Sequence, residues 1–430
     1  MESRTILMTG SGGREQALLK KLREDKRVGE IFIAPGNAGT GQAGTNVDIQ
    51  ATDINALLEF ARQKKPFLTI FTGEDVLAEG GVDAFRMHCH RAFGPTKKAA
   101  RIESSKKFSK ELMVNAGILT APFAVFTDYH SALAYVDGHG GTFRPCMIKA
   151  SGLAQGKGAV ACKTLAEAKQ ALQAMFVDKK FGEASLTVVI EKFLEGGIEF
   201  SAHGIAGGGR HFLFPFAMDH KKAFENDEGE NTGGMGTIAP VFQSPMLRQY
   251  ANDTIAKTLE QLESWNSRFE GCLYPGFMLQ GDTPYVLEFN ARFGDPETQV
   301  YMRLLESPLL DLFMYSANQD MSHCPEPKWR PGYAVCIMAC AAGYPGPPRK
   351  GDVITGIEEA EALPDIVVYH SGTKATPEGI VTNGGRVLGV SAYADDLGTA
   401  LSKAYSAMSL INFTGMHYRP DIGKRYRELR

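Results

Sequence analysis

The sequence lacks a long apolar run, a pair of cysteines at C-x-x-C spacing and any marked excess of one charge. No stretch of about 18 apolar residues occurs in the chain, so a transmembrane helix is not expected. The seven cysteines are odd in number and scattered, which indicates neither a zinc site nor a disulfide framework. A net charge of −3 gives no reason to expect a nucleic-acid or membrane partner. Glycine interrupts the N-terminus too early for a signal peptide, so we expect a reduced cytoplasmic protein.

A complete dinucleotide-binding motif is also missing. Residues 10–15 read G-S-G-G-R-E between an apolar strand and a helical pattern, and Glu15 stands where G-x-G-x-x-G needs its third glycine. The next strand, residues 31–34, runs into Pro35 without the acidic residue that would hold a ribose hydroxyl. These departures disfavour a dehydrogenase. A strand, a glycine turn and a helix N-terminus still favour a small anion site, with a plain tight turn as the alternative.

A Walker A loop is absent as well. Residues 151–158 read S-G-L-A-Q-G-K-G, where three residues rather than four precede G-K and a strand follows in place of a helix. A glycine-rich hairpin with Lys157 at its centre is what a mobile lid over phosphates would need, although a merely flexible hairpin has the same composition. Lys149, on the strand before it, is expected to face a cleft.

The remaining pattern predicts an α/β protein of two to four domains, because 430 residues exceed the size of one core. Strands alternate with helices up to Pro95, which indicates a parallel sheet, and Glu74 follows its third strand at the edge where such sheets bind ligands. Residues 219–236 are polar and glycine-rich, so we expect a long functional loop. After Pro331 short strands with glycine turns and a last helix predict a small C-terminal domain.

The stretch 285–298 carries the strongest chemical pattern. In a strand, alternation places Val286, Glu288 and Asn290 on one face, with apolar residues behind them. Glu288 and Asn290, roughly 7 Å apart, suit a hard cation held jointly with substrate phosphates. A half-buried edge strand with ordinary polar residues is the alternative. The bend that follows is expected to expose three charged side chains, Arg292, Asp295 and Glu297.

Several ordered motifs together resemble the phosphoribosylamine–glycine ligase (glycinamide ribonucleotide synthetase) family of ATP-grasp enzymes. They are G-S-G-G-R-E at 10, F-G-P at 93, S-K at 105, I-K-A-S-G-L-A-Q-G-K-G at 148, I-E-K-F-L-E-G at 190, D-H-K-K-A at 219, N-T-G-G-M-G at 231, L-E-F-N-A-R-F-G-D-P-E at 287, Y-P-G at 344, I-V-T-N-G-G-R-V-L-G-V at 380 and D-I-G at 421. The likeness runs over nearly the whole chain.

The resemblance implies three regions: an N-terminal parallel α/β (pre-ATP-grasp) domain over residues 1–102, a central α+β ATP-grasp domain over 103–330 and a β-rich C-terminal domain over 331–430. A mobile lid subdomain is expected at about residues 123–192. The implied reaction joins glycine to 5-phosphoribosylamine in purine synthesis and converts ATP to ADP and phosphate through glycyl phosphate. Mg²⁺ or Mn²⁺ is the implied cofactor, the partners are these small molecules, and a monomer or weak homodimer is expected.

The family's site residues carry over to matching positions. Implied ATP contacts are Lys106, Lys149, Gly156, Lys157, Gly158, Glu191, Phe193, Leu194 and Glu199. Implied metal ligands are Glu288 and Asn290. Implied substrate contacts are Gly12, Gly13, Arg14, Glu15, Glu74, Lys221, Asn231, Arg292 and Asp295. Arg292, Lys157 and Asp219 are the implied catalytic residues.

The chain departs from the family pattern at four places. T-G-E-D-V-L stands at residues 72–77 where the family has G-P-E-A-P-L, Ser151 replaces an aspartate, Glu230 replaces a proline, and Gln280 stands on the strand where many ATP-grasp enzymes have a carboxylate. The alternatives are therefore another ATP-grasp ligase or carboxylase of purine synthesis with a different acceptor, or an idle nucleotide-binding protein. An idle site has no need of Lys149, Lys157, Glu288, Asn290 and Arg292 together, which disfavours the second.

Overall fold

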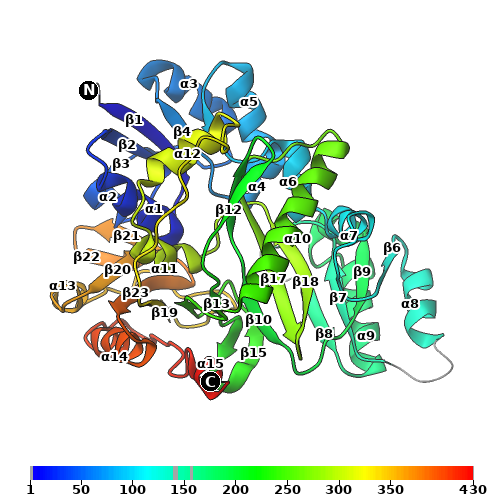
Figure 1. Ribbon diagram of the computed structural model, residues 1–430. Helices are drawn as coiled ribbons and strands as arrows, with labels where there is room; N and C mark the ends of the chain where they lie inside the picture. Colours follow the sequence, from blue (N-terminus) through cyan, green and yellow to red (C-terminus); the bar gives the residue numbers. More distant parts are fainter. Residues whose placement is uncertain (1–2, 139–143, 155–157, 430) are drawn as a thin grey trace.

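The N-terminal part of the computed structural model is a parallel sheet with strand order β3-β2-β1-β4-β5 (Figure 1). The structure describes residues 3–138, 144–154 and 158–429. The strands are β1 (Arg4–Gly10), β2 (Val28–Pro35), β3 (Thr45–Asn46), β4 (Leu68–Ile70) and β5 (Ala92–Phe93). The helices are α1 (Gly13–Arg23), α2 (Thr40–Ala43), α3 (Ile54–Lys64), α4 (Glu74–Glu79) and α5 (Gly81–Met87). The predicted parallel α/β architecture of this part is confirmed.

A separate antiparallel sheet of order β6-β9-β7-β8 projects from the body of the molecule, at the right of Figure 1. Its elements are β6 (Phe123–Phe126), α8 (Tyr129–Asp137), β7 (Cys146–Ala150), β8 (Ala159–Cys162), α9 (Leu165–Leu172), η1 (Gln173–Val177), η2 (Gly182–Leu186) and β9 (Val188–Lys192). Helix α9 begins with the predicted capping box of Thr164 and Glu167. The sheet has its own small core, around Ile148 and Leu172, and we call this unit the lid sheet.

The central sheet is antiparallel and has the order β10-β17-β11-β12, with β18 also paired to β17. Its strands are β10 (Ile198–Ser201), β11 (Gly204–Gly207), β12 (Arg210–Leu213), β17 (Gly271–Gln280) and β18 (Thr283–Asn290). The neighbouring helices are α6 (Lys97–Ser104), α7 (Lys106–Asn115), α10 (Pro245–Ser264), α11 (Glu297–Leu304) and α12 (Leu309–Ala317). The predicted hairpin of β17 and β18 is confirmed, and Gly281 supplies its positive φ of 58°.

The register of this hairpin corrects one sequence prediction. Glu288 pairs with Gly276, but the next pair is Val286 with Phe277, so Leu287 is an extra residue in β18. Such a bulge reverses the alternation of side chains beyond it. Val286 is therefore fully buried in the core, together with Phe289, and not on the face of Glu288 and Asn290 as strict alternation predicted.

Strands from the central and the C-terminal parts of the chain form the last large sheet, which is antiparallel and has the order β13-β16-β19-β23-β20. Its elements and neighbours are β13 (Met218–Asp219), β14 (Lys222–Phe224), η3 (Glu225–Asp227), β15 (Glu228–Asn231), β16 (Gly236–Ala239), β19 (Tyr333–Cys340), α13 (Ile357–Glu361), β20 (Ile366–His370), β21 (Thr373–Thr376), β22 (Gly379–Thr382), β23 (Arg386–Ala394), α14 (Leu397–Met408) and α15 (Lys424–Glu428). Residues 219–236, predicted as a loop, instead form a β14–β15 hairpin between two core strands. Strand 236–239 pairs with the C-terminal strand β19, and strand 218–219 joins the same sheet through its pairing with 236–239. The boundary at 330 and 331 therefore stays a prediction.

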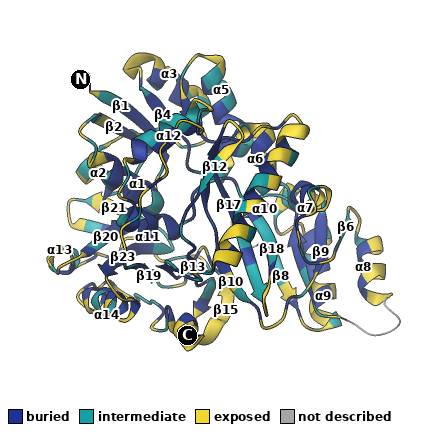
Figure 2. Cartoon of the chain, viewed as in Figure 1, coloured by how far each residue is buried: buried dark blue, intermediate teal, exposed yellow. Residues whose placement is uncertain are grey.

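Burial follows the layers of this architecture. Strands β19 and β23 are buried along almost their whole length, whereas β18 is only partly buried and the outer faces of α8 and α14 are exposed (Figure 2). One core is shared by the central sheet and the C-terminal sheet, through residues such as Phe277 and Val390. No helix in the described part of the chain is long and apolar enough to span a membrane. All seven cysteines lie within the described residues and are free thiols in the structure.

Candidate active site

Strand β18 and the bend after it bring together the side chains predicted to hold a metal. Glu288 and Asn290 lie on the face opposite the core, and the Glu288 carboxylate is 46% exposed. The Lys106 ammonium, at the first residue of α7, lies 3.7 Å from Glu288 Oε2. Arg292 Nη2 donates a hydrogen bond to Asn290 Oδ1 over 3.3 Å. Two oxygen-bearing side chains, a lysine and an arginine thus stand side by side.

These oxygen donors fit a magnesium ion that takes its other ligands from phosphate and water. Among the described residues no group of three or more His, Cys, Asp or Glu side chains is placed to enclose a metal. Mg²⁺ is typically bound through one or two carboxylates and the phosphates of its nucleotide, so two ligands suffice. Gly276, opposite Glu288, leaves room beside the carboxylate, since a Cβ there would come no closer than 3.9 Å to it.

Arg292 joins β18 to the N-terminal sheet. Its Nε lies 3.1 Å from Glu74 Oε2, and its Nη2 lies 3.0 Å from Glu103 Oε1. The Arg292 charge holds the pKa of Glu74 at about 2, against burial that raises it. Burial lowers the pKa of Arg292, but Glu103 and Glu74 outweigh it, so the guanidinium stays charged. The predicted site residues Glu74 and Arg292 are therefore in direct contact, although 218 residues separate them in the chain.

The glycine turn before α1 lies beside this contact. Arg14 Nη1 donates to the Phe293 carbonyl at 2.7 Å, and Arg292 donates to the same oxygen at 3.3 Å. The backbone N–H of Gly12 donates to Glu15 Oε2, and that of Arg14 donates to Asp295 Oδ2 at 3.3 Å. Carboxylates of the protein thus use the amide donors for which we expected a bound anion. Gly13 is packed against Gln299 and Ser371, where a Cβ would clash at 2.6 Å.

A second ionic group contains the buried carboxylates of Asp219 and Glu297 and the side chain of Lys221, which is 36% exposed. The Lys221 ammonium contacts Asp219 Oδ2 and lies 3.8 Å from Glu297 Oε1. Tyr274 donates a 2.6 Å hydrogen bond to Glu297 Oε1, and burial alone would raise the pKa of that carboxyl. Lys221 is the largest opposing influence, and the pKa of Glu297 falls to about 2. Glu297 is 1% exposed, so the prediction that the bend exposes it was wrong: it begins α11 and points inward.

The predicted nucleotide contacts lie where the lid sheet meets the central sheet. Lys149 Nζ is 2.9 Å from Glu191 Oε1, and both side chains are buried. Phe193 and the buried Leu194 follow β9, and Glu199 lies on β10. Gly158 accepts a backbone hydrogen bond from Ala150, which closes the β7–β8 hairpin. Gly156 and Lys157 lie outside the described residues, so their predicted roles stay predictions.

The contacts of two residues considered in the sequence, Gln280 and Asn231, do not connect them to the groups described above. Gln280 pairs with Thr283 at the far end of β17 and donates to the Glu195 carbonyl, so it does not face Glu288. The residue opposite Glu288 is Gly276, which brings no ligand. Asn231 ends β15, and the described contacts do not connect its side chain to the ionic groups above.

Sequence reasoning gave no role to Arg386, Glu103 or Lys110. Arg386 Nη1 donates to the Gly233 carbonyl at 2.6 Å, and its guanidinium also contacts Asp295. Glu103 accepts from the Ala291 N–H at 2.7 Å and pairs with Arg292. Glu103 and Lys110 stand outside the motifs that carry the resemblance. Arg386 lies within one of them, at residues 380–390, but only the folded chain shows which groups it contacts.

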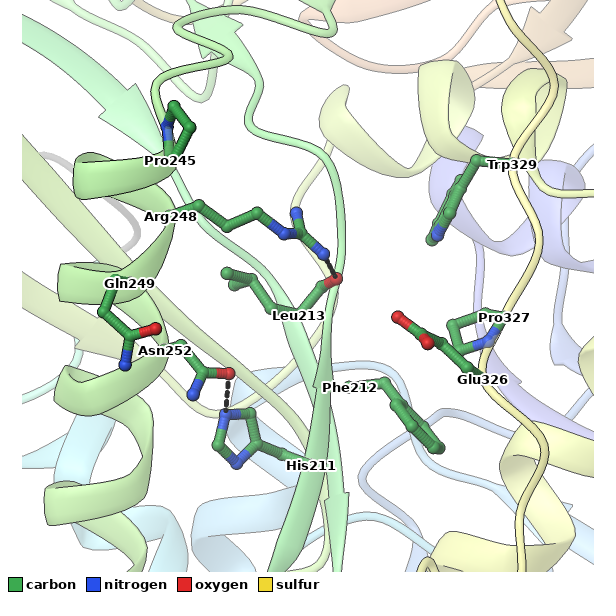
Figure 3. A pocket seen from close by; sticks show the side chains of 10 residues that line it. All are labelled: His211, Phe212, Leu213, Pro245, Arg248, Gln249, Asn252, Glu326, Pro327 and Trp329. Atoms are coloured by element: carbon green, nitrogen blue, oxygen red, sulfur yellow. Dashed lines mark hydrogen bonds between the residues drawn. The ribbon is translucent and has the colours of Figure 1, made fainter.

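A well-formed cavity of about 360 Å³ lies elsewhere, between β12, the first turns of α10 and residues 326–329 (Figure 3). Its lining residues are His211, Phe212, Leu213, Pro245, Arg248, Gln249, Asn252, Glu326, Pro327 and Trp329. None of them is a predicted site residue. Arg248 donates to the carbonyl of Leu213 at 3.1 Å, and His211 Nε2 lies 3.0 Å from Asn252 Oδ1. Since these polar groups are already paired, we do not assign the substrates to this cavity.

Comparison with known proteins gives matches along the whole chain. Family models described as the N, ATP-grasp (A) and C domains of phosphoribosylglycinamide synthetase match residues 4–103, 104–298 and 334–425. A phosphoribosylamine–glycine ligase from Halalkalibacterium halodurans is 40% identical over 98% of this chain and 96% of its own. A second, from Vibrio parahaemolyticus, is 41% identical over 98% of both. The crystal structure of the Thermotoga maritima phosphoribosylamine–glycine ligase superposes with a TM-score of 0.84 at 30% identity, covering 97% of this chain and 99% of that one.

Proposed function

The chain belongs to the phosphoribosylglycinamide synthetase family, and we propose that the cluster around Arg292 and Glu288 is where its reaction takes place. The protein is an ATP-dependent ligase that joins glycine to 5-phosphoribosylamine in purine biosynthesis. The resemblance seen in the sequence and the predicted α/β ATP-grasp fold are both confirmed. The roles of single residues are the subject of the proposal.

ATP binds where the lid sheet faces the central sheet. Lys149 and Lys106 neutralise its phosphates, and the segment from Glu191 to Leu194 lies along the adenine, with Glu199 toward the ribose. Glu288 and Asn290 would hold Mg²⁺, or Mn²⁺ in its place, which when bound neutralises charge on the nucleotide phosphates. Two observations support this arrangement: Lys106 lies close to Glu288, and the Glu288 side chain is only half-buried.

Glycine and phosphoribosylamine bind on the side of the N-terminal sheet. The glycine carboxylate attacks the γ-phosphorus of ATP, which releases ADP and forms glycyl phosphate. The amine of phosphoribosylamine then attacks the acyl carbon, and phosphate and a proton are released as the amide forms. Because the attacking groups belong to the substrates, no side-chain nucleophile is needed, and catalysis rests on position and charge. Arg292, held by Glu74 and Glu103, lies where it can stabilise negative charge on the acyl phosphate.

The acidic side chains near Arg14 are suited to the amine substrate. Glu15, Glu74 and Asp295 are hydrogen-bond acceptors gathered at the start of α1. Ionised carboxylates accept hydrogen bonds from an amine and from ribose hydroxyls. They therefore favour the amine and ribose of phosphoribosylamine over a negatively charged group. We place Asp219, Lys221 and Asn231 between the bound phosphoribosylamine and the bound glycine. Asn231 belongs to the β14–β15 hairpin.

The observation that carries the proposal is the contact of Arg292 with Asn290 on one side and with Glu74 on the other. It joins the predicted metal site and the predicted amine site through one side chain. The test is ADP release measured with glycine, β-alanine or serine, each with and without phosphoribosylamine. We expect release only with glycine and phosphoribosylamine together. Equal turnover with another amino acid or another amine would favour the related ligase with a different acceptor.

A further inference from the structure

Three charged side chains form a buried group behind the proposed phosphate site: Lys110, Lys149 and Glu191. Lys110 Nζ lies 3.2 Å from Glu191 Oε2, and Lys149 Nζ lies 2.9 Å from Glu191 Oε1. The side chains of Lys110 and Glu191 are each 2% exposed, and that of Lys149 is 8% exposed. We call these three residues the buried triad. Two ammonium groups therefore share one carboxylate, and the triad keeps one positive charge in excess.

The members of the triad come from two different parts of the molecule. Lys110 is on α7, one turn after Lys106, while Lys149 and Glu191 lie on β7 and β9 of the lid sheet. Lys110 Nζ also donates to Thr120 Oγ1 at 2.6 Å, and that hydroxyl donates to the carbonyl of Val286 at 2.6 Å. Lys110 thus ties the lid sheet to the strand that carries Glu288.

The charge balance has a consequence for the nucleotide. With both lysines charged, Glu191 cannot neutralise Lys149 completely, so Lys149 retains attraction for phosphates. If Lys110 were removed, Glu191 would pair one-to-one with Lys149, and the pair would have no net charge. Interactions between charges are strong where water is excluded, so this difference acts on a bound polyanion. Burial lowers the pKa of Lys110 to about 8, which agrees with its enclosed position.

We propose that Lys110 is a positioning residue for nucleotide binding, which holds Glu191 so that Lys149 keeps its positive charge available to the ATP phosphates. This inference rests on the proposed nucleotide site and adds a residue to it. Lys110 itself is enclosed and pairs with protein atoms, so it acts through Glu191 and not by touching ATP.

The test measures the affinity for Mg·ADP by calorimetry, without the other substrates. We expect Lys110→Met to raise the Kd about tenfold. The double variant Lys110→Met with Glu191→Gln removes the carboxylate as well and leaves Lys149 unopposed. The backbone at residue 191, which is the part of it that we place along the adenine, stays the same, because the Glu191 side chain is occupied by the two lysines. We therefore expect the Kd of the double variant to return to within about threefold of wild type. Lys107→Met is the matched control, because Lys107 is exposed on the same helix and pairs only loosely with Glu111, at 3.9 Å.

The outcomes separate the possible roles. If the double variant binds as weakly as Lys110→Met or more weakly, Lys110 is merely structural and the inference is overturned. The inference is also overturned if Lys110→Met binds Mg·ADP with the same Kd as the wild type. If Lys110→Met fails to fold, as circular dichroism would show, Lys110→Gln takes its place, because it removes the same charge but keeps a polar group beside Thr120 and Glu191. Absence of Mg·ADP binding in the wild-type protein would instead overturn the nucleotide site on which the inference rests.

Discussion

Replacing Glu288 by alanine separates a role in catalysis from a role in stability. The side chain is 46% exposed, and within the described residues its carboxylate has one ion pair, with Lys106 at 3.7 Å. Two charges at that distance in water attract by about 1 kcal/mol, and measured surface pairs stabilise by about that or less. We therefore expect Glu288→Ala to lower the melting temperature by only about 2 to 4 °C. Strand β18 keeps its core contacts, because Val286 and Phe289 lie on the other face.

The expected effect on activity is much larger. One of the two protein ligands of the proposed metal is lost, and neutralisation of phosphate charge by a metal is worth several kcal/mol. A loss of about 4 kcal/mol corresponds to a fall in kcat of about 1,000-fold. The assay is glycine- and phosphoribosylamine-dependent ADP release at saturating Mg²⁺, together with a thermal melt of the same sample.

The matched control is Glu111→Ala. Glu111 pairs with Lys107 at 3.9 Å and is 49% exposed, so its removal costs a surface pair of the same kind. We expect its turnover to equal that of the wild type. If Glu288→Ala retains more than about a tenth of the wild-type kcat, an essential metal ligand at Glu288 is refuted. A large drop in melting temperature would show that the carboxylate has a structural role that the contacts do not reveal.

Three further predictions concern other parts of the structure. Arg292→Lys should lower kcat/KM about 100-fold, because a lysine cannot bridge Glu74 and Glu103 at once. A kcat/KM within threefold of wild type would contradict the role given to the Arg292 guanidinium. Glu74→Gln should cost about 2 to 3 kcal/mol of unfolding free energy at pH 7, since the pKa of Glu74 lies at about 2 instead of 4.5. That contribution to stability is complete above pH 4.5 and is lost as the pH falls through 2. The urea unfolding midpoints of the variant and the wild type should therefore converge on acidification. A difference between the midpoints that does not change with pH would refute this role of Glu74. Thr164→Ala should cost about 1 kcal/mol through loss of the α9 capping box, and hydrogen exchange should increase in α9 first; exchange that increases uniformly over the chain would contradict a local effect.

Local patterns predicted the elements well because their causes lie within a few residues. The β17–β18 hairpin follows from two apolar runs around Gly281, and the α9 capping box follows from Thr164 and Glu167. The bulge at Leu287 could not be predicted in the same way. It depends on how β18 pairs with β17, so the alternation of a single strand does not contain it.

Contacts between residues that are far apart in the sequence limit how much of the site can be predicted. Glu297 was expected at the surface because glycine and proline surround it, but Lys221 and Tyr274 enclose it. Arg386 contacts Asp295, 91 positions away in the sequence, and the motif at residues 380–390 that contains Arg386 does not indicate this partner. Nothing in their own segments predicts such partners, since packing alone brings the segments together. The nucleotide, metal and substrate roles carried over by resemblance stay predictions until a ligand is observed.

The most direct test of the account is a crystal structure with Mg²⁺ and a non-hydrolysable ATP analogue. We expect metal density between Glu288, Asn290 and the phosphates, with the ammonium groups of Lys106 and Lys149 in contact with phosphate oxygens. A nucleotide bound in the His211–Trp329 cavity of Figure 3, or a metal away from Glu288, would contradict the central claim.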